Sequence, residues 1–169
     1  MMMAYVDTNV ILAKYIPTDK LSSRATAFLE SIDRKIASPV SLIELAAVIS
    51  RIDSNMEAPP ELLQEPPRRR VRTLVEFMIR DSGFFLASVP AQSRIKVAGV
   101  VLSVPIEYHN CIRLAHALKL KTLDLVHLAY ADGLRKWGHD IDAFVTFDVD
   151  ILEKSDAIYD ELGIEIKEP

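Results

Sequence analysis

Short apolar runs alternate along the chain with longer segments in which apolar residues return every three or four positions. The apolar runs fit buried strands, and they cover residues 3–6, 35–38, 84–89, 143–147 and 164–166. The longer segments have the spacing of amphipathic helices, and they cover residues 9–15, 20–33, 39–52, 68–80, 107–118, 123–137 and 150–159. The alternation predicts an α/β fold in which helices cover both faces of a mostly parallel sheet.

The middle of the chain, residues 54–104, departs from this alternation. Residues 94–104 are rich in valine and isoleucine with Gly99 among them, which predicts a β-hairpin or an extended segment. No boundary is evident, so we expect one domain over residues 1–169, with residues 54–104 as an elaboration of it. The first part of this stretch carries four prolines that predict a loop, or a short helix between two breaks: Pro59, Pro60, Pro66 and Pro67.

Composition narrows the class of protein. Of the 169 residues, 50% are hydrophobic and 26% charged, which is typical of a globular domain. The formal net charge of −4 argues against a globally basic nucleic-acid-binding protein, although a local basic patch stays compatible with it. The single cysteine, Cys111, excludes an internal disulfide and a CxxC metal site. No apolar run approaches the roughly 18 to 20 residues of a membrane span, and we expect a reducing, cytoplasmic location.

Four carboxylates fall where predicted strands end or predicted helices begin. Asp7 follows the first strand, and Asp148 ends the strand that begins at residue 143. Glu44 lies in the second turn of the helix after the second strand, and Asp124 begins a later helix. Because the carboxyl ends of parallel strands line one crevice, we expect these four side chains to converge.

Each of these carboxylates also has a purely structural explanation. Asp7 and Asp148 are typical helix caps, Asp124 suits a first helical turn, and Glu44 follows Ser41 as in a capping box. For the set this explanation is weaker, because Glu44 and Asp124 stand among apolar residues, where an unpaired carboxylate is costly. A divalent cation would offset the repulsion. Oxygen ligands favour Mg²⁺ or Mn²⁺, whose bound water suits phosphate chemistry.

Four segments, in this order and spacing, resemble PIN-domain proteins, and they look most like the VapC-type toxin ribonucleases: VDTN at 6–9, SLIEL at 41–45, LDLVHLA at 123–129 and VTFDVD at 145–150. The resemblance covers nearly the whole chain. It implies a three-layer α/β/α fold, a metal-dependent endoribonuclease acting on RNA, an antitoxin protein as partner, and a homodimer. The stretch between Glu44 and Asp124 is longer than in compact toxins of this kind.

The resemblance also implies an acidic quartet that binds Mg²⁺ or Mn²⁺ and catalyses hydrolysis by water: Asp7, Glu44, Asp124 and Asp148. One or two ions are compatible with it. Glu44 would complete the shell of the first ion, position a second, or act on the attacking water. Asn9 and Thr146 match polar positions that support such a site, and Asp150 is a further carboxylate there or a residue that faces water.

Two other features are candidates for function. Four arginines lie within five positions, and they suit either contact with an RNA backbone or a solvated helix start: Arg68, Arg69, Arg70 and Arg72. His127 lies one helical turn after Asp124, and we interpret it as a satisfied, partly buried histidine rather than a metal ligand.

Two rival functions stay open beside the toxin ribonuclease. One is a PIN nuclease of RNA processing or quality control that has no antitoxin. The other is a PIN-fold RNA-binding or scaffold protein without turnover. The acidic quartet argues against the second, because a scaffold does not require four carboxylates that repel one another.

Overall fold

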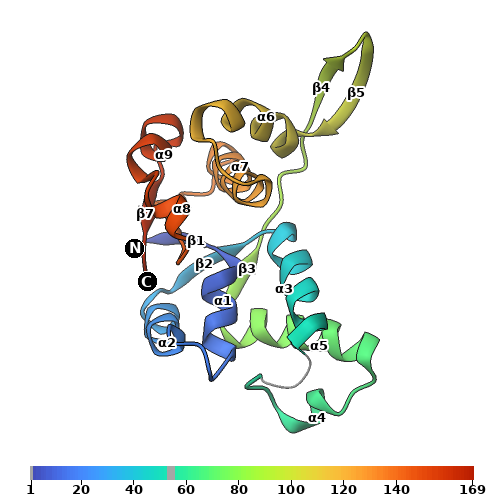
Figure 1. Ribbon diagram of the computed structural model, residues 1–169, viewed down its shortest axis with the longest axis vertical. Helices are drawn as coiled ribbons and strands as arrows, with labels where there is room; N and C mark the ends of the chain where they lie inside the picture. Colours follow the sequence, from blue (N-terminus) through green and yellow to red (C-terminus); the bar gives the residue numbers. More distant parts are fainter. Residues whose placement is uncertain (1, 53–55) are drawn as a thin grey trace.

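A computed structural model describes residues 2–52 and 56–169 of the chain (Figure 1). Five strands form a sheet in the order β3-β2-β1-β6-β7, and all of their pairings are parallel. They are β1 (Met3–Val6), β2 (Arg34–Ala37), β3 (Phe84–Leu86), β6 (Ala143–Val145) and β7 (Glu165–Lys167). The predicted strands are thus present, in the mostly parallel arrangement that the alternation indicated.

Helices cover both faces of this sheet (Figure 1). One face carries α1 (Thr8–Tyr15), α2 (Ser22–Ser31), α3 (Pro39–Ile52) and α5 (Pro67–Asp81), with the short α4 (Pro60–Leu63) beside α5. The other face carries α6 (Ile106–Leu118), α7 (Thr122–Lys136), α8 (Val149–Leu152) and α9 (Ser155–Leu162). The three-layer α/β/α fold is therefore confirmed.

The central strand β1 joins the two hydrophobic cores. Successive strand side chains point to opposite faces of a sheet. Ala4 and Val6 accordingly lie in the core under α1, α3 and α5, whereas Met3 and Tyr5 lie in the core under α6 and α7. All four residues are buried, which explains why β1 reads as a continuous apolar run rather than an alternating one.

The middle of the chain contains a hairpin that projects from the three layers (Figure 1). Its antiparallel strands are β4 (Gln92–Val97) and β5 (Val100–Pro105). The two residues between them, Ala98 and Gly99, both have positive φ, as a tight hairpin turn requires. The hairpin prediction is therefore confirmed. The proline-rich stretch contains the short helix α4, while residues 54 and 55 of that prediction lie outside the described residues.

Two predictions of elements are wrong. Residues 150–159 do not form one helix: the N–H of Lys154 bonds to the carbonyl of Ile151, three residues back, and this tight turn separates α8 from α9. Asp148 does not end β6, which stops at Val145. Thr146 N still donates to the carbonyl of Lys167 in β7, but the next two N–H groups go to side chains: Phe147 N donates to Asn9 Oδ1 and Asp148 N donates to Thr146 Oγ1.

The packing of α7 against the sheet gives a test of the fold. Leu128 is fully buried in the core beneath α7, so Leu128→Ala should lower the free energy of unfolding by about 2–5 kcal/mol. Val101 lies on the projecting hairpin and is 60% exposed, so Val101→Ala should change the free energy of unfolding by less than about 0.5 kcal/mol. Urea denaturation followed by circular dichroism measures both. Equal effects of the two variants would contradict this packing.

Candidate functional site

Asp7 is the most constrained carboxylate of the chain's candidate site. It leaves the end of β1 and caps α1, with its Oδ1 accepting the Thr8 N–H at 2.7 Å. Its Oδ2 accepts from Asn9 Nδ2 at 2.8 Å and from Thr146 Oγ1 at 2.7 Å. Asn9 Oδ1 in turn accepts the N–H of Phe147. The start of α1 and the segment after β6 are thereby tied together around one buried carboxylate, through Asn9 and Thr146, the two residues that the resemblance proposed as supports.

Glu44 and His127 meet Asp7 from two other elements. Glu44 extends from α3, and its Oε2 lies 2.9 Å from Nε2 of His127 on α7. The same Nε2 is 3.9 Å from Oδ1 of Asp7. One ligand atom from each of these three side chains lies within 4.8 Å of the others. The structure therefore brings Asp7 and Glu44 together, as predicted, with a buried histidine between them.

Asp124 stands beside this group, one helical turn before His127. Its Oδ2 is buried and has no hydrogen-bond partner among the described residues. Burial first, and then the charges of Asp148 and Asp7, raise the pKa of Asp124 to about 6. The effect of these charges shows that the three carboxylates are near one another, although Asp124 and Asp148 lie outside the tightest group.

Asp148 and Asp150 lie toward solvent. Asp148 caps α8, and its Oδ1 accepts the N–H of Asp150 at 2.8 Å. The Asp150 side chain is exposed and pairs with Lys121 Nζ at 2.5 Å. Asp148 is thus at the outer side of the quartet, whereas Asp150 is engaged by a lysine on the surface.

The ionisation of the two central carboxylates differs. Burial raises the pKa of Asp7, and the nearby His127 and Thr146 oppose that effect only in part. Burial also acts to raise the pKa of Glu44, but the interactions with His127 and Thr8 together outweigh it, so that this pKa lies below its usual value. Glu44 is therefore an ionised carboxylate at neutral pH, held beside a carboxylate that is costly to ionise.

These side chains fit a divalent cation. They offer carboxylate oxygens of like charge, those of Asp7 buried, and one buried oxygen of Asp124 that has no hydrogen-bond partner among the described residues. Such groups are costly unless a cation compensates them. Oxygen donors of this kind suit Mg²⁺ or Mn²⁺.

His127 and its neighbours are what the sequence interpretation missed. Both ring nitrogens have partners, as expected of a satisfied histidine, but one of those partners is Glu44. Its spacing of three residues from Asp124 was the available signal, because that spacing puts both side chains on one face of α7. The other nitrogen faces the hydroxyl of Tyr5, which nothing in the apolar pattern of β1 distinguished.

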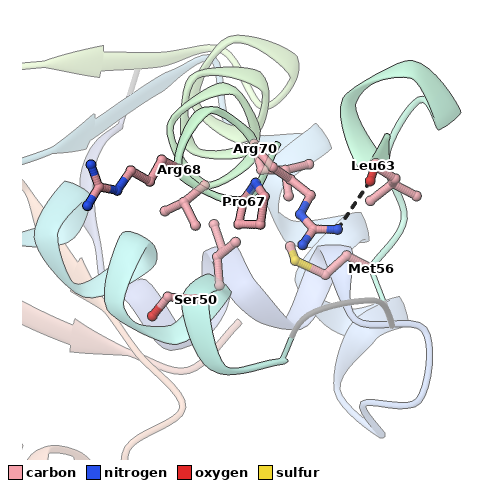
Figure 2. A pocket seen from close by; sticks show the side chains of 9 residues that line it. Ser50, Met56, Leu63, Pro67, Arg68 and Arg70 are labelled. Carbon is pink, nitrogen blue, oxygen red and sulfur yellow. Dashed lines mark hydrogen bonds between the residues drawn. The ribbon is translucent and has the colours of Figure 1, made fainter. Parts of the chain in front are cut away.

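The four arginines do not share one face. Figure 2 shows Arg68 and Arg70 pointing in opposite directions at a pocket between α3, α4 and α5, with Arg70 donating to the carbonyl of Leu63. Arg69 lies 3.8 Å from Glu65, and Arg72 donates to Glu76 at 2.9 Å. Contact of these arginines with RNA stays a prediction.

Comparison with known proteins agrees with the fold. Within the described residues, no helix combines the length and the apolar character needed to cross a membrane. The chain matches no curated protein. The PIN domain family matches it over residues 4–157, which includes every member of the acidic quartet. PIN domains are generally metal-dependent nucleases. Because this match covers most of the chain, the protein belongs to the PIN domain family.

Proposed function

We propose that this protein is a Mg²⁺- or Mn²⁺-dependent endoribonuclease that hydrolyses RNA phosphodiesters at the acidic quartet. The observation that carries the proposal is the convergence of Asp7, Glu44 and Asp124 at one edge of the sheet, with a buried oxygen on Asp124 that no described residue partners. A scaffold protein would gain nothing from placing desolvated like charges together.

Each carboxylate has a role in this proposal. Asp7, Asp124 and Asp148 would hold an ion, which when bound lowers the pKa of a water and stabilises charge on the phosphate. Three hydrogen-bond donors already fix the orientation of the Asp7 carboxylate before any ion binds. Glu44, ionised and partly exposed, would accept a proton from the attacking water or bind a second ion. One ion and two are both compatible with this arrangement.

The narrower role of a toxin, together with an antitoxin partner, a homodimer and a cytoplasmic location, rests on the resemblance to VapC-type toxins. One surface supports a protein partner. An apolar groove of about 740 Å³ lies between α3, α6, α7 and the hairpin, and Glu44 is part of its lining. Ile43 and Ile112 in this groove are 70% and 62% exposed, and together with its other apolar lining residues they form a continuous patch of the kind that a partner protein covers.

Cleavage of a mixed pool of structured and single-stranded RNA tests the proposal. With Mg²⁺ or Mn²⁺ the wild type should cut the pool, and EDTA should abolish cutting. Asp7→Asn removes a charged ligand and should lower the rate by more than about 100-fold. Asp160→Asn makes the same chemical change at an exposed position on α9 and should leave the rate unchanged. Fragments resolved on a denaturing gel provide the rates.

Metal titration separates the explanations of a negative result. If no RNA is cut and Mn²⁺ binds the folded wild type and Asp7→Asn with equal affinity, the quartet is not a metal site and the proposal fails. If binding is lost in Asp7→Asn while no RNA is cut, the metal site is retained and turnover on this pool is rejected.

The repulsion at Asp124 predicts a pH-dependent stability. The folded protein holds a proton on Asp124 up to about pH 6, whereas unfolded aspartate releases it near pH 3.9, so ionised Asp124 destabilises the fold above pH 6. In EDTA at pH 7.5, Asp124→Asn should therefore melt at a higher temperature than the wild type. The difference should shrink as the pH falls from 6 to 4. Thermal melts followed by circular dichroism measure it.

Mn²⁺ should reverse this order at pH 7.5, because the ion compensates the ionised carboxylate in the wild type and loses a ligand in Asp124→Asn. Asp160→Asn should follow the wild type throughout. A gain in melting temperature that stays constant from pH 4 to 7.5 would show that the charge of Asp124 is not its cause.

A further inference from the structure

A chain of buried polar side chains leads from the interior of the sheet to Glu44. The hydroxyls of Ser38, after β2, and Tyr5, in β1, are 2.7 Å apart. The Tyr5 hydroxyl lies 2.9 Å from Nδ1 of His127, whose Nε2 lies 2.9 Å from Glu44 Oε2. Ser38 and Tyr5 are fully buried and His127 is 2% exposed, whereas Glu44 reaches the groove surface. Residues from β1, α3, α7 and the end of β2 thus form one continuous hydrogen-bonded chain.

The chemistry of the partners fixes which nitrogen of His127 carries a proton. Nε2 faces Glu44, and Asp7 Oδ1 is 3.9 Å away. An ionised carboxylate only accepts hydrogen bonds, so Nε2 must be the donor, whether the ring is neutral or charged. In the neutral ring Nδ1 is then the acceptor of a hydrogen bond that the Tyr5 hydroxyl donates, and the Ser38 hydroxyl donates in turn to the Tyr5 oxygen.

Tyr5 is well placed to hold the other end of the ring. Its own ring stacks on Phe144 with centroids 5.3 Å apart, and burial raises the pKa of its hydroxyl, which therefore stays protonated. A stacked phenol has little freedom to follow a moving partner. The Tyr5 hydrogen bond therefore limits rotation of the imidazole, and through Nε2 it limits the positions open to Glu44.

We propose that the Ser38–Tyr5–His127 chain is a positioning device that presents Glu44 to the metal and the attacking water in one fixed orientation. This inference rests on the proposed function for its consequence, although the hydrogen bonds themselves exist without metal or RNA. His127 acts through Glu44 and not as a ligand. Partners of this kind orient the carboxylates and histidines that bind metals, and their loss typically costs about 10- to 100-fold in affinity or rate.

The first experiment determines the tautomer of His127 in the metal-free protein. Long-range ¹H–¹⁵N NMR spectra at pH 8 should show the proton on Nε2, with a shift that changes in Glu44→Gln, where the acceptor loses its charge. A proton on Nδ1 would leave Nε2 free to bind a cation and would overturn the positioning role. Because neither metal nor RNA is present, the result is independent of whether the protein cleaves RNA.

The second experiment compares two substitutions that each keep one end of the chain. His127→Gln retains an N–H near the position of Nε2, and it should bind Mn²⁺ within about threefold of the wild type. His127→Asn retains a polar atom near Nδ1 but loses the donor to Glu44, and its Mn²⁺ affinity, measured by calorimetry, should fall by about 10- to 100-fold. Equal losses in both variants would contradict a role through Nε2.

A double-mutant cycle with Glu44 completes the test. If His127 acts through Glu44, His127→Asn should cause no further loss of Mn²⁺ affinity in a Glu44→Gln protein. Undiminished loss in that background would indicate a merely structural histidine. Tyr5→Phe, which removes one hydroxyl from a stacked ring, provides the same cycle should His127→Asn not fold. Failure of the wild type to bind Mn²⁺ would reject the positioning of a metal ligand, and the tautomer would still report the chain itself.

Discussion

The Asp7 carboxylate can be buried at the end of β1 only because three donors converge on it. One is the first backbone N–H of α1, and the others come from Asn9 in the same helix and Thr146 after β6. These bonds need β1 and β6 to be neighbours in register, since Thr146 follows the residue that pairs with Val6. The strand order around β1 and the geometry of the site are therefore one constraint: a sheet that moved β6 away would leave a desolvated carboxylate with fewer donors.

Placing other carboxylates around Asp7 works against stability, and the fold tolerates it because the cost is spread over several elements. The charge of Glu44 is stabilised by its hydrogen bond with His127, and Asp148 accepts a backbone N–H as the cap of α8 near solvent. Asp124 has no such relief at Oδ2, and the raised pKa of its carboxyl reflects this. The cap and first-turn explanations are thus correct for Asp7, Asp148 and Asp124 as local structure. Local capping and the clustering of charge are compatible, because both use the helix starts at the same edge of the sheet.

The sequence could predict the layers and most of the candidate site, because both follow from local rules. Buried strands read as apolar runs, and the carboxyl ends of parallel strands share an edge, which brings Asp7 and Glu44 together. Asp148 shows where these rules stop: β6 ends three residues earlier, and the N–H of Phe147 bonds to the side chain of Asn9 on α1, a contact that no local pattern encodes. Tyr5 shows a second limit. In an apolar strand it reads as core, and only the pairing of β1 with β2 and the packing of α7 give its hydroxyl two polar neighbours. The prediction of one domain remains a prediction.

The members of the site differ in how firmly the apoprotein holds them. Asp7 has three donors, Glu44 has one buried donor backed by a stacked tyrosine, and Asp124 Oδ2 has none among the described residues. A cation that binds here would find Asp7 already fixed by these donors, behind the more exposed Asp148. The carboxylate of Asp124, whose pKa is raised by burial and by the charges of Asp148 and Asp7, would also help to hold the ion. The hydrogen bonds to Asp7 and the raised pKa of Asp124 let the fold tolerate these carboxylates without a metal ion. The same carboxylates would then be available to bind an ion when one is present.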